Sequence, residues 1–273
     1  MTKDTDENRI KAEKAAERKE EKATSNRRPL MGKLCRAVWV LMILGSLFHL
    51  YTGGFGLLST MSQRSLHLMF MLVPTFFLYA ASPKAAKKLP WYDVLFGALV
   101  LAACLYIFLT WSKQTMRVGD PSTLDLFFGA VLILAVLEGA RRTAGNALAL
   151  TAGIMLAYCY FGKYLPGGLA HRGYSLSRII SFFSLTSEGI FGVPIGVSAS
   201  LIVLFVIFGG VLNVTGGGQF FIDSTYSLAG RLKGGTAKTA VVASAGMGMI
   251  SGSPIANVVT TGTVTIPLMK SGG

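Results

Sequence analysis

Residues 238–270 read KTAVVASAGMGMISGSPIANVVTTGTVTIPLMK, and this stretch decides how the chain can lie in a membrane. It is apolar enough for a bilayer, yet it is interrupted at Gly246, Gly248, Gly252, Pro254, Gly262 and Pro267. A continuous helix tolerates glycine and proline poorly. Unwound backbone at membrane depth is stable only where it is buried in protein or lines a water-filled cavity. We therefore predict one re-entrant helical hairpin, spanning approximately residues 238–268.

The side chains of this predicted hairpin offer neutral oxygens, and no Asp or Glu occurs from Ser224 to Gly273. Discontinuous helices are typical of binding sites in secondary transporters, because freed carbonyls and half-helix ends can hold ions and substrate. A Na⁺ ion held by neutral oxygens would keep its charge available for an anionic substrate, and exposed N–H groups of a half-helix would add to that attraction. The candidate ion- and substrate-binding residues are Ser251, Gly252, Ser253, Asn257, Thr260, Thr261, Gly262 and Thr263.

Close helix packing is the alternative interpretation of these small and hydroxylated residues. For any single Ser or Thr, packing is the simpler explanation. The whole block SGSPIANVVTTG, with glycine and proline on both sides of the break, favours a binding site.

Six apolar runs precede the hairpin. With 52% hydrophobic and 14% charged residues, this chain of 273 residues has more apolar surface than a soluble domain can bury. Several runs approach the ~20 residues that a spanning helix needs, and flanking polar residues or local thinning of the bilayer allow shorter ones to cross. The runs are 34–51, 66–81, 91–111, 123–137, 144–160 and 190–214. We predict an all-α integral membrane protein with about six transmembrane helices.

Two further segments are amphipathic. Residues 173–188 mix serines with bulky apolar side chains, and residues 219–232 place apolar side chains on one helical face. Both patterns predict helices that lie along a membrane interface, the first on the outer side and the second on the inner side.

The net charge of +13 indicates membrane orientation rather than nucleic-acid binding. Of the 26 Lys and Arg residues, 11 lie before Val38 and the other 15 are spread between apolar runs. A nucleic-acid surface would need these charges clustered on one folded face, so we expect no nucleic-acid partner. Residues 1–30 are predicted to form a charged cytoplasmic tail beside anionic lipid.

The loops support the same orientation, because Lys and Arg accumulate on the cytoplasmic side of membrane proteins. With the tail inside, the inner loops hold Lys84, Lys87, Lys88, Arg141, Arg142, Arg231, Lys233 and Lys238. The outer loops hold Arg64, Lys113, Arg117, Lys163, Arg172 and Arg178. Together with the basic tail, this distribution predicts a cytoplasmic N-terminus.

Nothing in the pattern predicts an enzyme. The cysteines and histidines lack metal-ligand spacing; they are Cys35, Cys104, Cys159, His49, His67 and His171. Glu138 lies beside Arg141 and Arg142 at a helix end, which favours an ion-paired anchor, with a proton relay as the alternative. We expect no cofactor beyond a coupling ion.

Four passages resemble a known family of transporters: LEGARRTAGNALAL, YLPGGLAHRGYS, TSEGIFGVPIGVSASLIVLFVIFGGVLNVTGGGQFF and GRLKGGTAKTAVVASAGMGMISGSPIANVVTTGTVTIPLMKSGG. They cover residues 137–273 almost continuously. The chain resembles the membrane component of tripartite ATP-independent periplasmic (TRAP) transporters. In particular, it resembles the form that fuses the small subunit to a DctM-like large subunit and works with a TAXI-type binding protein.

The resemblance implies a permease of the bacterial inner membrane. In this family a periplasmic protein delivers an organic acid, typically a carboxylate, and the permease moves it inward with a Na⁺ gradient. By resemblance, residues 31–142 correspond to a four-helix small-subunit region, and residues 143–273 to the N-terminal part of the large subunit. Residues 240–265 then correspond to its first hairpin, and Ser251, Gly252, Ser253, Asn257, Thr261 and Gly262 match the stretch near Na⁺ and substrate.

One difference from the family affects the expected activity. The family's large subunit has a second half with its own hairpin, whereas this sequence ends at Gly273, directly after the first. We therefore expect the sequence to represent the front half of a fused permease, with the rest of the ion and substrate cage outside it. A non-transporting scaffold or assembly fragment of such a complex is the alternative function.

Overall fold

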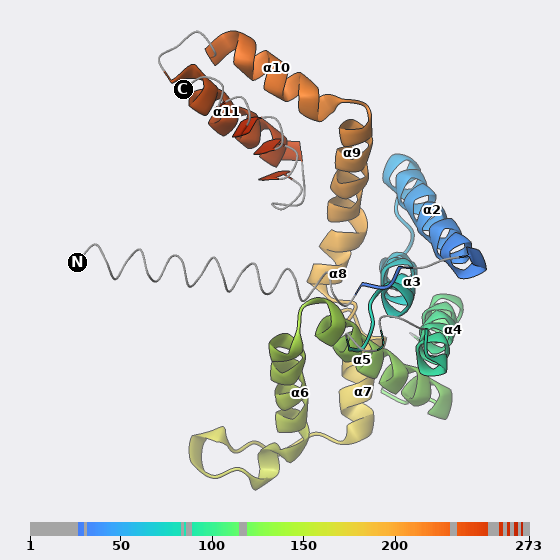
Figure 1. Cartoon of the computed structure of the whole chain (residues 1–273). Coiled ribbons are helices and arrows are strands. Elements are labelled where there is room, and N and C mark those ends of the chain that lie inside the picture. The colour runs from blue at the N-terminus through green and yellow to red at the C-terminus, as the bar shows by residue number, and fades with distance from the viewer. Residues whose placement is uncertain are drawn as a thin grey trace. The chain divides into compact units, whose positions relative to one another are not determined.

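The computed structural model describes residues 27–29, 32–82, 85, 89–114, 119–229 and 234–250, together with positions 257, 258, 261, 262, 265, 266 and 269. Regular structure in this part of the chain is helical, apart from one isolated β-bridge between Arg27 and Tyr79, which confirms the all-α prediction (Figure 1). The chain divides into two compact units. The first comprises Met1–Leu47 and Leu57–Gly196, and the second comprises Phe48–Gly56 and Val197–Gly273.

Helices α2 to α6 overlap the first five predicted apolar runs, and α7 lies in a predicted amphipathic segment. They are α2 (Gly32–Phe55), α3 (Thr60–Leu78), α4 (Trp91–Gln114), α5 (Thr123–Thr143), α6 (Asn146–Phe161) and α7 (Leu176–Leu185). The chain continues as α8 (Val193–Val197), a π-helical turn (Ser198–Ile202), α9 (Val203–Val214), α10 (Gly217–Ala229) and α11 (Gly235–Ile250). The two predicted amphipathic segments are thus helices, α7 and α10.

Four of the six predicted crossings are helices both long and apolar enough to span a membrane. Among the described residues these are Leu34–Phe55, Trp91–Lys113, Thr123–Thr143 and Val193–Leu212. The other two predicted runs are also helical. However, α6 has 16 residues, a length of about 24 Å against a hydrocarbon thickness of ~30 Å. The first turns of α3 contain Gln63, Arg64 and His67, which lower its hydropathy.

Helix α3 tolerates these polar side chains because protein surrounds it. Ten of its 19 residues are buried, and it packs chiefly against α4. Phe76 of α3, Ile107 of α4 and Leu132 of α5 are fully buried in the same hydrophobic cluster. A helix covered in this way does not need an apolar surface on every side.

The prediction that Arg64 lies in an outer loop is wrong. The structure places Arg64 one turn inside α3, where its guanidinium donates a hydrogen bond to the Phe191 carbonyl. Phe191 is itself fully buried in the core of the first unit. A hydrogen bond between residues 127 positions apart therefore ties α3 to the turn that precedes α8.

Helices α5 and α7 approach closely at Gly129. A Cβ atom added there would lie 2.7 Å from Ile180 Cγ2 and closer still to Ser184 Oγ. Gly153 on α6 is the matched contrast, since an added Cβ atom there meets no described residue within 4 Å.

We expect Gly129→Ala to destabilise the protein relative to Gly153→Ala by about 1–3 kcal/mol, the usual cost of overpacking a close contact. Both changes gain the same ~1 kcal/mol of helix propensity, so the difference isolates the contact. The measurement is the free energy of unfolding in mixed micelles. Equal stability of the two variants would show that α7 does not pack on α5 as described.

Candidate functional site

The candidate site begins with a reversal of the chain after α11. The Asn257 side-chain amide donates hydrogen bonds to the Ser244 carbonyl at 3.0 Å and to Ser244 Oγ at 3.3 Å. In a continuous helix these residues, 13 positions apart, would be separated by ~20 Å along the axis. The chain has therefore reversed direction between Ser244 and Asn257. The re-entrant placement of this hairpin in a membrane stays a prediction.

Hydroxyl side chains follow Asn257 on the second arm of the hairpin, the helical positions between 257 and 269. The described positions 257, 258, 261, 262, 265, 266 and 269 are helical. Thr261 Oγ1 donates to the Asn257 carbonyl at 2.7 Å, and Thr265 Oγ1 donates to the Thr261 carbonyl at 2.7 Å. Both threonines are buried, with exposed fractions of 4% and 3%. Each hydroxyl oxygen keeps acceptor lone pairs after donating, so this face can still offer oxygen atoms to a ligand.

Two buried oxygens in the second unit have no hydrogen-bond partner among the described residues. They are Asn257 Oδ1 and Thr239 Oγ1. Thr239 lies on α11, about 7.5 Å along the helix axis from Ser244, and it is fully buried. An unsatisfied buried polar atom costs about 1–3 kcal/mol, and a bound ion or water would remove that cost. The Asn257 oxygen is an acceptor only, so it suits a cation or a donor group.

The predicted site residues are only partly described. Asn257, Thr261 and Gly262 are helical positions that follow the reversal, and their role as site residues stays a prediction. Among the described residues, an added Cβ atom at Gly262 would meet only Ile266 Cδ1, at 3.5 Å, which is an ordinary contact. Ser251, Gly252, Ser253, Thr260 and Thr263 lie outside the described residues.

The sequence did not reveal a second polar cluster, which lies in the first unit around Asp93. Asp93 is fully buried at the start of α4. It forms ion pairs with Arg28, which precedes α2, and with Arg142 near the end of α5, the latter at 2.7 Å. Only 2% of each arginine side chain is exposed.

These arginines also satisfy carbonyl groups at the C-terminal end of α3. Arg28 Nη1 donates to the Phe76 carbonyl at 3.0 Å, and Arg142 Nη1 donates to the Tyr79 carbonyl at 3.0 Å. The last carbonyls of a helix have no partner within the helix and carry partial negative charge, so cations are favourable there. The Asp93 cluster therefore fastens three helix ends and the segment before α2 to one another.

Glu138 extends this cluster, and it pairs with Arg141 and Arg142 as the sequence predicted. Its carboxylate accepts hydrogen bonds from Arg141 at 2.7 Å and from Arg142 at 2.8 Å. Arg141 also donates to the Ala81 carbonyl. These contacts support the interpretation of Glu138 as an anchor. The sequence does not indicate that Asp93 forms buried ion pairs, because an acidic residue in the first turn of a helix is already favoured by the helix dipole.

A family model for the tripartite ATP-independent periplasmic transporter, DctM component, matches residues 131–273. The match covers more than half of the 273 residues. The chain belongs to the DctM family. The part of the sequence that matches includes α6 to α11, the Asn257 arm and the second half of α5.

DctM proteins are transporter components and not enzymes, and they work with a periplasmic binding protein and a small membrane subunit. The family assignment therefore makes this chain part of a TRAP transporter permease. Searches of curated proteins and of solved structures found no match.

Proposed function

We propose that this DctM-family chain belongs to a permease that imports organic acids as carboxylates, with Na⁺ as the coupling ion. A TAXI-type periplasmic protein would deliver the acid to the bacterial inner membrane. The N-terminal tail would then lie in the cytoplasm, in keeping with the excess of Lys and Arg before Val38. By resemblance, residues 31–142, which hold α2 to α4 and nearly all of α5, would take the place of the small subunit.

The observation that carries the proposal is the free, buried Oδ1 of Asn257, on an arm whose neighbouring oxygens are neutral. Hard cations prefer oxygen ligands, and amide and hydroxyl oxygens can surround one without cancelling its charge. Because no carboxylate occurs after Asp223, a bound Na⁺ would leave this region positive. A carboxylate substrate would then bind more tightly when Na⁺ is present, which is the coupling that symport requires.

The test is uptake of a labelled carboxylate by the permease in proteoliposomes, with its binding protein on the outside. We expect uptake to require both the binding protein and an inward Na⁺ gradient, and to fall to background when K⁺ replaces Na⁺ at equal ionic strength. Unchanged uptake in K⁺ would refute Na⁺ coupling. Lack of uptake in every condition, with the binding protein still attached to the membrane, would favour the scaffold function.

A further inference from the structure

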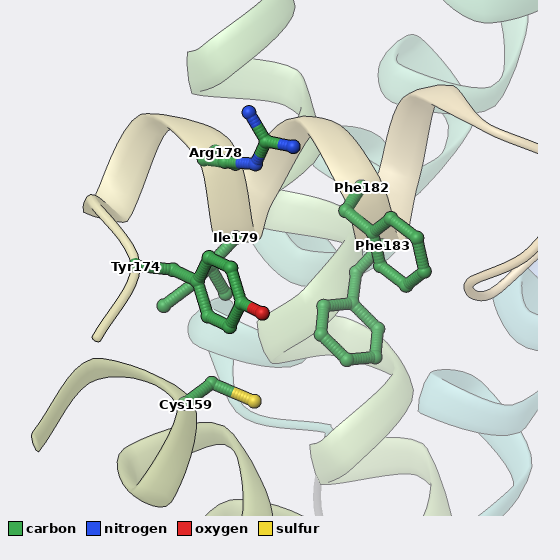
Figure 2. Close-up of a pocket in the computed structure, with 6 residues that line it drawn as sticks. All are labelled: Cys159, Tyr174, Arg178, Ile179, Phe182 and Phe183. Atoms are coloured by element: carbon green, nitrogen blue, oxygen red, sulfur yellow. The ribbon is translucent and has the colours of Figure 1, made fainter. Parts of the chain in front are cut away.

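A cavity of about 250 Å³ lies between the end of α6 and helix α7, within the first unit. Its lining residues are Cys159, Tyr174, Arg178, Ile179, Phe182 and Phe183, drawn in Figure 2. Four of the six come from one helix, α7, which is strongly amphipathic. None of these lining residues is among the candidate ion-site residues, which belong to the second unit.

The walls of the cavity are held by short-range hydrogen bonds. The Tyr174 amide donates to the Cys159 carbonyl at 3.0 Å, which closes the connecting loop onto the end of α6. Ser175 accepts from the Arg178 amide and so caps α7. The His171 amide donates to the Gly162 carbonyl at 3.1 Å, and this bond folds the rest of the loop back. The cavity is therefore preformed.

The lining of the cavity is apolar on one side and cationic on another. Figure 2 shows the aromatic rings of Tyr174, Phe182 and Phe183 around the space, with the Arg178 guanidinium on the side away from Cys159. This guanidinium is exposed and has no ion pair or hydrogen bond among the described residues. Residues 162–187 contain three basic side chains, Lys163, Arg172 and Arg178, and no Asp or Glu. An anion is the ligand that this charge favours.

The surrounding residues place the cavity at headgroup depth. Tyr158, Tyr160 and Tyr164 surround the end of α6, and all three are exposed. Tyrosines at the end of a membrane helix settle at the boundary between headgroups and hydrocarbon. An arginine at the same level can reach phosphate groups while its stem stays in apolar surroundings.

We propose that this cavity binds an anionic phospholipid, with one acyl chain in the apolar part and the phosphate on Arg178. The volume equals roughly eight times the ~30 Å³ that one water molecule occupies, which is room for a run of methylene groups. The planar guanidinium matches phosphate oxygens in a bidentate arrangement. This binding site does not depend on the proposed transport activity.

The headgroup charge, and not the acyl chain, determines which lipid the cavity prefers. An acyl chain is already in hydrocarbon when the lipid is in the bilayer, so its transfer into the cavity gains little hydrophobic energy. A lipid with net negative charge keeps its attraction to Arg178, whereas a choline headgroup brings its own cation. The site therefore prefers phosphatidylglycerol to phosphatidylcholine.

Native mass spectrometry of the permease from mixed phosphatidylglycerol and phosphatidylcholine nanodiscs tests the proposal. We expect retained phosphatidylglycerol, and Arg178→Gln should lower its retention relative to phosphatidylcholine about tenfold, as the loss of one charged hydrogen bond implies. Arg172→Gln is the matched control, because Arg172 is exposed on the loop that precedes α7 but does not line the cavity. Equal losses in both variants, or no loss in Arg178→Gln, would overturn the proposal.

Cys159 provides a second measurement inside the cavity. It is partly exposed, whereas Cys104 is fully buried, so a Cys35→Ser variant leaves Cys159 as the reactive thiol. We expect maleimide labelling of Cys159 to be slower in phosphatidylglycerol nanodiscs than in phosphatidylcholine nanodiscs. Adding Arg178→Gln should abolish that difference. Labelling rates that do not depend on the lipid would contradict the preferred occupation of the cavity by phosphatidylglycerol.

Discussion

Asp93→Asn is expected to destabilise the protein by about 3–5 kcal/mol, the range for removing one partner of a buried ion pair. Asp93 is the shared anion of Arg28 and Arg142, and all three side chains are almost inaccessible to solvent. The variant leaves two buried guanidinium groups with one carboxylate fewer. Unfolding in mixed micelles, or the midpoint of thermal unfolding in detergent, measures the loss.

Asp120→Asn is the control for this prediction, because Asp120 is exposed just before α5. Its stability should stay within about 0.5 kcal/mol of the wild type, as for most surface substitutions. Adding Arg28→Met to Asp93→Asn should recover part of the lost stability, since it removes one uncompensated charge. If Asp93→Asn were as stable as Asp120→Asn, the buried cluster would not be a structural anchor.

Asn257→Ala is expected to raise the Na⁺ concentration for half-maximal uptake by about 10–100-fold, the usual cost of losing a group that orients or completes a metal site. The variant removes the free Oδ1 and the hydrogen bonds to Ser244. Initial rates of carboxylate uptake against Na⁺ concentration provide the measurement. Asn146→Ala at the exposed start of α6 is the matched control and should leave the curve unchanged.

Asn257→Asp tests whether this position affects Na⁺ and substrate binding without removing the side-chain oxygen. The aspartate keeps an oxygen in place but adds a negative charge to a region that has no carboxylate. We expect Na⁺ to bind this variant at least as well as the wild type, while the carboxylate substrate binds less well because the charge of Na⁺ is now cancelled. If Asn257→Ala and Asn257→Asp both left the Na⁺ dependence unchanged, the ion site would not include Asn257.

Local patterns in the sequence predicted much of the fold. Hydropathy located the helices of both units, since a spanning helix needs a long apolar run whatever surrounds it. Glycine and proline after Ile250 predicted the reversal that the bond between Asn257 and Ser244 reveals. Glu138 and its arginines are three and four residues apart, so helix geometry alone brings them together.

The burial of α3 and the position of Arg64 could not be predicted from hydropathy. A helix that begins with polar residues has the same low hydropathy as a loop. Gln63 and His67 are tolerated in α3 because neighbouring helices bury them. The same limit applies to the oxygen atoms of the hairpin. The sequence indicated Asn257 as one of eight candidate residues. Only the structure shows that its amide nitrogen bonds to Ser244 while its amide oxygen has no partner among the described residues.

The sequence by itself thus determined a helical membrane protein, because hydropathy and backbone propensity are properties of neighbouring residues. Only the tertiary structure decided that Asp93 joins Arg28 and Arg142, which are 65 and 49 positions away. It also decided that α7 closes a cavity over Cys159. Buried charge pairs and cavities depend on which distant segments meet, and no local pattern encodes that meeting.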